Sequence, residues 1–178
     1  MTKLLNLHDS IFAMISAAAG EWFLPTLARF AFAAVLLKYF WGSAMTKLGS
    51  GIGGLFNLDP NGYVQIFPKK MEMLGYDPAG LSIIHKLIAF LGTWSEFILP
   101  AMILVGLLTR LAAFGMFGFV IVQTLVDVTA HGAKLGVWFN NTSGDLIADQ
   151  RLLWFVLFAT LVIKGAGPLS LDRLLKRA

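Results

Sequence analysis

A single carboxylate stands in the middle of a long apolar stretch of this sequence. Between residues 87 and 126 the only charged residues are Glu96 and Arg110. Arg110 ends a Gly-Leu-Leu-Thr-Arg segment, which is typical of a break between two hydrophobic helices, so only Glu96 is expected at depth. An ionisable group inside a membrane is costly and commonly marks a functional site. Glu96 is therefore the first candidate for chemistry, as a proton acceptor or a ligand-binding group.

The composition indicates a membrane protein. Apolar residues make up 57% of the chain and charged residues 13%, with a mean hydropathy of +0.75. A soluble domain of 178 residues cannot bury so much apolar surface. The net charge of +4 does not point to nucleic acid, because the basic residues cluster at the ends of apolar segments, as interfacial cations do. We expect the lipid bilayer, and no nucleic acid, as a partner.

Four apolar stretches are predicted to span the membrane as helices, since about 20 helical residues cross the hydrocarbon core. They cover approximately residues 22–45, 81–105, 108–128 and 151–166. Two long loops, 46–80 and 129–150, alternate with one tight connection. This alternation predicts an all-α fold, an up-down four-helix bundle that forms a single domain over residues 1–178, with both long loops on the same face.

The N-terminal residues predict a short amphipathic helix that lies at the membrane interface. Their apolar side chains fall on one helical face: Leu4, Leu7, Ile11, Phe12 and Ile15.

Basic residues are slightly more numerous on the side that holds both termini and the tight connection. That side carries Lys3, Arg110, Lys164, Arg173, Lys176 and Arg177. The opposite side carries Lys47, Lys69, Lys70, Lys134 and Arg151. The excess predicts that both termini are cytoplasmic.

Helical geometry gives Glu96 a set of neighbours on its own helix. His85, Ala89, Gly92, Glu96 and Pro100 share one face. The small residues among them would let another helix approach, so this face should point into the bundle. Pro100 has no N–H to donate to the carbonyl of residue 96, which leaves a backbone acceptor close to the carboxylate.

Arg29 is the predicted partner of Glu96. The two residues lie about 10 Å and about 16 Å from the same membrane face, a gap that long side chains can close. Together with Trp94, which is too deep for an aromatic belt, and Gln123 on the third span, they form a candidate ligand pocket. The alternative is that the intramembrane ion pair only fixes the helix register, because buried pairs are weak evidence of function.

A second polar cluster is predicted near the outer surface. Gln123, Asp127 and His131 recur at intervals of four along the third span, and an antiparallel hairpin brings His85 level with His131. His85, Asp127 and His131 could then bind a metal, a quinone head group or a substrate. The alternative is that both histidines are interfacial side chains. Their loose spacing is not a metal-ligand motif, so no metal site is predicted.

The sequence identifies no cofactor. The absence of cysteine excludes thiol catalysis and thiolate-bound iron–sulfur clusters, so redox chemistry would need a bound cofactor or a protein partner. Haem is disfavoured because the chain has 3 histidines and His8 is far from the other two. A quinone remains a candidate. No independent catalytic motif is present, so catalytic residues are unknown and the question whether the chain is an enzyme stays open.

Several separate segments form a recognisable pattern. They are Arg29, Gly42 and residues 45–48 at the end of the first span, residues 105–113 after Glu96, and residues 165–172. Together they resemble the DoxX family, the DoxX/DoxD-like four-span membrane proteins of bacteria, over nearly the whole chain beyond Glu21. The chain departs from the family pattern at residues 37–41, where a more apolar helix end with a glycine is usual, and in the long loop of residues 50–80.

The resemblance implies a protein of the bacterial inner membrane. Family members are associated with a terminal quinol oxidase and thiosulfate:quinone oxidoreductase, and others with oxidative-stress or sulfur-related redox complexes. The family pattern marks Arg29, Lys47, Glu96, Thr109, Arg110, Gly165, Gly167, Ser170 and Asp172. Ser170 is also expected to cap a short basic helix, with Asp172 near its positive end.

Three functions follow as hypotheses. The first is an oxidoreductase-associated or stress-response subunit that holds a quinone-like or other small lipophilic ligand, with a redox protein and a homo-oligomer as candidate partners. The second is a non-enzymatic scaffold that binds periplasmic partners through the long loops. The third is a small proton-coupled transporter, for which an intramembrane carboxylate and a proline kink are suitable parts.

Overall fold

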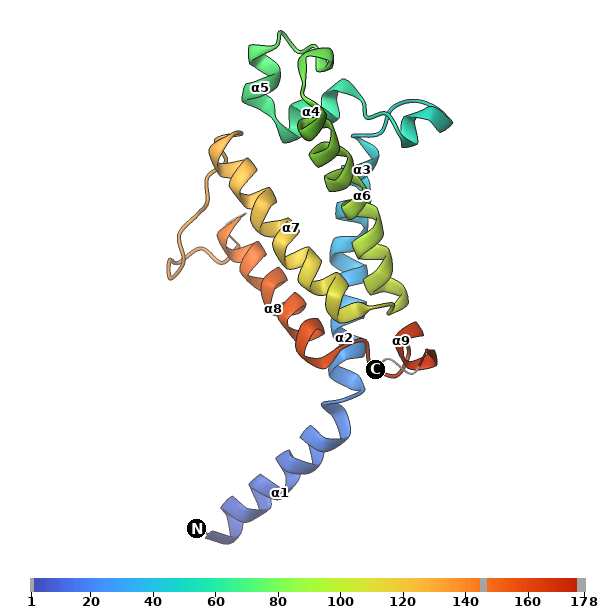
Figure 1. Ribbon diagram of the computed structural model, residues 1–178. Helices are drawn as coiled ribbons and strands as arrows, with labels where there is room; N and C mark the ends of the chain where they lie inside the picture. The colour runs from blue at the N-terminus through green and yellow to red at the C-terminus, as the bar shows by residue number, and fades with distance from the viewer. Residues whose placement is uncertain (1, 145–146, 176–178) are drawn as a thin grey trace.

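The computed structural model describes residues 2–144 and 147–175, and within them the chain is helical apart from its connections (Figure 1). Lys176 and Arg177, used above for the orientation, lie outside the described residues. The α-helices are α1 (Thr2–Ala19), α2 (Phe23–Phe32), α3 (Lys38–Met45), α4 (Pro60–Ile66), α5 (Pro68–Met73), α6 (Ile83–Val105), α7 (Thr109–Thr129), α8 (Ala148–Lys164) and α9 (Leu171–Leu174). The shorter turns are η1 (Ala33–Leu37), η2 (Ile52–Leu55) and η3 (Pro78–Gly80).

Three helical segments are long and apolar enough to cross a membrane: Phe23–Met45, Ile83–Val105 and Thr109–Thr129. They agree closely with the first three predicted spans. The first is continuous through α2, η1 and α3, with the π-helical turn of η1 inserted in its middle. Such a turn adds a residue and shifts the face that the following side chains present.

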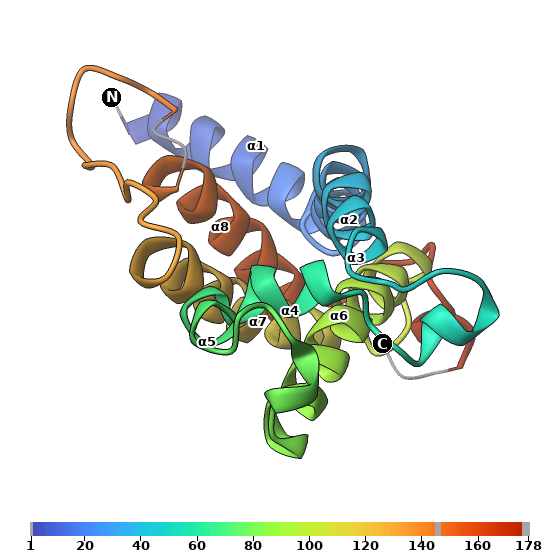
Figure 2. The ribbon, with the colours of Figure 1, turned by 90° about the horizontal axis from the view of Figure 1, so that it is seen from above.

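The body of the molecule is built from these segments and α8. α7 packs against both α6 and α8, α3 packs against α6, and α2 packs against α8 (Figures 1 and 2). Large side chains fill the space between them, among them Phe32, Phe40, Ile103, Met116 and Phe158. Gly106 ends α6 in the left-handed conformation, with φ 71°, and so allows the chain to reverse into α7.

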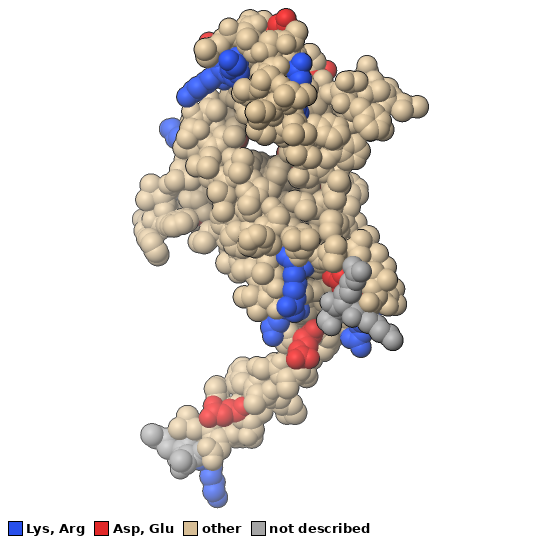
Figure 3. All heavy atoms as spheres, in the orientation of Figure 1, with Lys and Arg blue, Asp and Glu red and all other residues tan. Residues whose placement is uncertain are grey.

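The outer surface of the body is apolar. Phe30, Val35, Leu111 and Phe114 are exposed on the long helices. On the face drawn in Figure 3, the middle of the body shows no charged side chain, while basic and acidic groups lie beyond both ends. Apolar surface of this extent fits a lipid bilayer rather than water.

The two ends of the body differ. At one end α1 projects away from the other helices (Figure 1), and its side chains from Lys3 to Ala18 are exposed. At the other end α4 and α5 lie over the ends of α3 and α6. α4 begins with Asp59 as its N-cap, whose Oδ1 accepts a hydrogen bond from the backbone N–H of Asn61 at 2.9 Å. We call the first the α1 end and the second the α4 end.

Candidate functional site

Glu96 is paired with Lys47 in the interior of the protein. The Lys47 Nζ lies 2.8 Å from Oε2 and 3.0 Å from Oε1 of Glu96. Each side chain is only 6% exposed. The ammonium also donates to the Oγ of Ser43 at 2.7 Å and to its carbonyl at 3.1 Å. Every N–H of the lysine thus has an acceptor, which is the condition under which a buried charge pair is tolerated.

Arg29 does not reach Glu96, so the predicted Arg29–Glu96 pair is corrected. Its guanidinium donates instead to backbone carbonyls at the C-terminus of α6, those of Ile103 and Leu104, and to those of Ala166 and Leu169 after α8. The last carbonyls of a helix have no intrahelical donors and attract positive charge. This end of α6 lies about 10 Å along the helix axis from Glu96.

Lys47 is held in the interior by the segment that follows it. A lysine just after the last turn of α3 would ordinarily extend its ammonium toward water. Here Gly62 of α4 packs on it so closely that a Cβ at position 62 would come within 3.0 Å of the Lys47 carbonyl. The side chain therefore turns back along α3 to Ser43, four residues earlier. The four-residue spacing of Ser43 and Lys47 is the sequence signal that could have revealed this arrangement.

A groove runs between α6 and α7 beside the ion pair, with a volume of about 680 Å³. Lys47 and Glu96 form part of its lining. Its apolar walls are Ile88, Leu91, Leu99, Phe119, Val122 and Val126. Such a mixture of apolar wall and a few polar groups is typical of sites for small organic molecules.

Glycines create the space in this groove. A Cβ built at Gly92 or Gly118 would meet no other atom within 4 Å, apart from its own helix backbone. Gly92 was expected to let a neighbouring helix approach. The structure corrects this expectation, because its missing side chain leaves open volume beside Glu96 rather than a helix contact.

Gln123 contributes a buried polar atom without a partner. Its Nε2 donates to the hydroxyl of Tyr39 at 2.8 Å. Its Oε1 is buried and accepts no hydrogen bond from any described residue. A buried acceptor of this kind costs about 1–3 kcal/mol when it is left unsatisfied. Gln123 lines the groove, and a rotation of its amide would offer this buried oxygen to a donor on a bound molecule.

The predicted pocket residues are therefore only partly brought together. Glu96 and Gln123 line the groove, but Trp94 and Arg29 do not. Trp94 donates from its indole Nε1 to the carbonyl of Leu55 at 3.1 Å, and so ties α6 to the loop at the α4 end.

The predicted outer cluster is not formed as a group of three. His131 donates from Nε2 to the Gln65 carbonyl at 2.8 Å and lines the groove together with Asp127. His85 instead contacts the Ser82 hydroxyl through Nδ1 at 2.6 Å. Among the described residues, no group of three or more histidine or acidic side chains is placed to hold a metal ion.

Asp127 has a partner that was not predicted from the sequence. Arg151, in the first turns of α8, is 6% exposed and forms an ion pair with Asp127 and a hydrogen bond to the Thr124 hydroxyl. Arg151 had been counted as an interfacial cation. It is instead a buried link between α7 and α8.

The family-pattern residues at the α1 end bind backbone atoms. The carboxylate of Asp172 accepts from the N–H groups of Leu108 and Thr109, at 2.6 and 2.9 Å, which are the free donors at the start of α7. The Asp172 N–H in turn donates to the Gly106 carbonyl at 2.8 Å. Together with Arg29, this carboxylate fixes the C-terminal segment to the α6–α7 turn, and we call the two residues the Arg29–Asp172 clamp.

The remaining residues of the pattern allow close packing around this clamp. A Cβ at Gly165 would lie 3.2 Å from Nε of Arg110, and one at Gly167 would lie 3.1 Å from the Pro25 ring. Ser170 caps α9 as predicted, because its Oγ accepts from the Arg173 N–H at 3.3 Å. These contacts are architectural and include no reactive pair.

The apolar body, its membrane-crossing helices and the buried ion pair define a multi-pass membrane protein. The sequence profile of the DoxX family matches residues 24–132, and the chain belongs to that family. No curated protein and no solved structure matches the chain. The matched range includes both members of the Lys47–Glu96 pair and the whole of the groove between α6 and α7.

Proposed function

We propose that the chain is an inner-membrane subunit of a redox or oxidative-stress system and holds a quinone-like or other small lipophilic molecule in the groove between α6 and α7. The observation that carries the proposal is the buried, unpartnered Oε1 of Gln123 in an apolar groove that also contains a charged pair. Apolar walls suit a ring, and the polar atoms suit its oxygen substituents.

The groove offers an acceptor to the reduced form of a quinone. A quinol hydroxyl can donate to Oε1 of Gln123. The Ser43 hydroxyl belongs to the ion pair, because it accepts from Lys47 and donates to the Glu96 carboxylate. Glu96 provides a carboxylate close by for proton uptake or release. Electrons would come from a protein partner, because the described side chains include no redox centre of their own.

The membrane arrangement that goes with this function is a four-span, up-down bundle over a single domain. α8 packs against α7 and α2, and this packing supports its assignment as the fourth span although it is only 17 residues long. Exposed apolar side chains along α1 support its assignment as an interfacial helix.

The orientation that goes with this function has both termini in the cytoplasm. It is supported by the slightly larger number of basic residues on the side of the termini.

Binding of a short-chain benzoquinone to the detergent-purified protein tests the proposal. Wild type should show saturable binding in a calorimetric titration. Glu96→Gln should weaken binding about tenfold, the value of roughly one charged hydrogen bond. Gly92→Leu should abolish it, because the new side chain enters open groove volume without a clash.

Gly42→Leu is the matched control for Gly92→Leu. Gly42 is also a helical glycine whose Cβ would meet nothing within 4 Å, but it does not line the groove. Both substitutions raise helix propensity equally. Absence of saturable binding by wild type, or equal loss in both glycine variants, would sink the proposal.

A scaffold function is the second candidate, and one observation favours it. Ile52 and Phe56, at the exposed turn η2 of the long loop, are 85% and 70% exposed. If they dock a periplasmic partner, Ile52→Ser with Phe56→Ser should remove that partner from affinity-purified complexes and leave quinone binding intact. Retention of every co-purifying protein would count against it.

A further inference from the structure

A second cavity lies at the α1 end, separate from the groove between α6 and α7. Its volume is about 990 Å³, and residues from α1, α7, α8 and α9 line it. It is the place where the long helices end, so in a bilayer it lies at the level of the lipid head groups. Figure 3 shows basic side chains, with acidic ones beside them, in this part of the molecule, where α1 joins the body.

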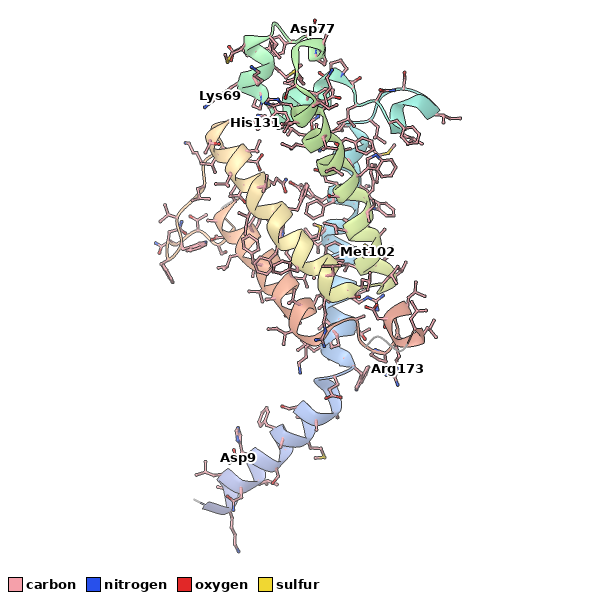
Figure 4. The ribbon with its side chains drawn as sticks, in the orientation of Figure 1. Asp9, Lys69, Asp77, Met102, His131 and Arg173 are labelled. Atoms are coloured by element: carbon pink, nitrogen blue, oxygen red, sulfur yellow. The ribbon has the colours of Figure 1, made fainter. Side chains whose placement is uncertain are left out.

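Three cations line this cavity without an internal partner. Arg110, Lys164 and Arg173 contribute to its lining. Within residues 2–144 and 147–175, none of them has an ion pair or a side-chain hydrogen bond. They come from α7, α8 and α9, so the fold brings together cations from three separate elements (Figure 4 labels Arg173).

The acidic residues of the lining do not neutralise these cations. Both carboxylate oxygens of Asp172 accept hydrogen bonds from backbone N–H groups at the start of α7, and its charge also interacts with that of Arg29. Glu21 also lines the cavity, but it forms no ion pair with the three cations. The cavity therefore keeps a net positive charge.

The same cavity has apolar walls. Ala17, Trp22, Leu111 and Ile163 line it beside the cations. A free inorganic anion has no apolar part that could contact such walls. A molecule with a negative head and an apolar body matches both parts, and basic pockets between transmembrane helices are known to bind anionic head groups.

We propose that this cavity binds the phosphodiester head group of an anionic phospholipid, with Arg110, Lys164 and Arg173 as its ligands and α1 as one wall. The site is independent of the groove and of the proposed function. The bound lipid would link α1 to the body and fix how that helix lies on the membrane surface.

Native mass spectrometry of the delipidated protein, with phosphatidylglycerol or phosphatidylcholine added back, tests the site. Wild type should retain phosphatidylglycerol in preference to phosphatidylcholine. Replacement of all three cations by glutamine should weaken phosphatidylglycerol binding roughly 100-fold. The double variant Lys164→Gln, Arg173→Gln keeps Arg110 in its place beside Gly165 and should therefore fold as wild type does. It should weaken phosphatidylglycerol binding roughly 30-fold.

The matched control removes three cations elsewhere, as Lys69→Gln, Lys70→Gln and Lys134→Gln, and should leave the preference unchanged. Equal loss in the control, no loss in the variants with altered cavity residues, or no preference in wild type would each overturn the site. Inorganic phosphate is the competing source of the same chemistry. Displacement of the lipid by millimolar phosphate would show that a free anion, and not a phospholipid, is the ligand.

Discussion

The Lys47–Glu96 pair and the Arg29–Asp172 clamp use charged side chains in different ways. In the clamp, each charged group forms its hydrogen bonds with backbone atoms. Arg29 donates to carbonyls at the end of a helix, and Asp172 accepts from N–H groups at the start of a helix. In the groove, the two charges face one another next to open volume. A charged group that satisfies the free backbone groups of a helix end has a structural role. A charged group that borders a cavity can contact a ligand.

The comparison therefore changes the meaning of the family pattern. Most of its residues serve the clamp or its packing, so their recurrence needs no chemistry. Lys47 and Glu96 are the members of the pattern that line the groove. If the distinction is right, substitutions at the two places should separate stability from ligand binding.

Glu96→Ala should produce the largest loss of stability. It leaves the Lys47 ammonium buried without its counter-charge, which costs about 3–5 kcal/mol. Unfolding in detergent, titrated with sodium dodecyl sulfate and followed by circular dichroism, measures this free energy. The double variant Lys47→Met, Glu96→Met should recover most of the stability, because a buried pair can be replaced by apolar side chains, but it should not recover ligand binding. A Glu96→Ala protein as stable as wild type would contradict the buried pair.

Arg29→Met should be the next most damaging change. It removes the donor from carbonyls on two segments, α6 and the chain after α8, at a cost of about 3 kcal/mol. Arg29→Lys should restore only part of this, because an ammonium cannot span both segments as a planar guanidinium does. The thermal midpoint in detergent should fall, while quinone affinity per folded molecule stays the same. A selective loss of affinity at normal stability would mean that the clamp takes part in binding.

Asp172→Asn should have a smaller effect in the same direction. The amide keeps one acceptor oxygen for the N–H groups of Leu108 and Thr109 but loses the charge, at a cost of about 1–2 kcal/mol. Hydrogen exchange should become faster at the start of α7 and remain unchanged around Glu96. Faster exchange in the groove instead would break the proposed separation of the two regions.

The sequence predicted the spans better than the contacts. Apolar run length defines a transmembrane helix directly, so the bounds of the first three spans were nearly correct. The partner of Glu96 was not predictable in this way, because axial distance along straight helices ignores the loop that covers Lys47. Gly62 sets that position from the α4 end, and the only local signal is the four-residue spacing of Ser43 and Lys47.

The groove was predicted in part for a similar reason. Glu96 and Gln123 were named because polar residues inside apolar spans are conspicuous. Gly92 and Gly118 were not recognised as groove-forming, since a glycine in a membrane helix is as consistent with close helix packing as with open space. Only the positions of neighbouring atoms distinguish these two cases.

The most direct test of the ligand groove is to identify the molecules that co-purify from native membranes in mild detergent. Mass spectrometry of extracts from wild type, Gly92→Leu and Gly42→Leu makes no assumption about the ligand. We predict a small lipophilic molecule with carbonyl or hydroxyl oxygens that is present in wild type and Gly42→Leu and absent from Gly92→Leu. The same set of bound molecules in all three proteins would contradict the assignment of the groove as a ligand site.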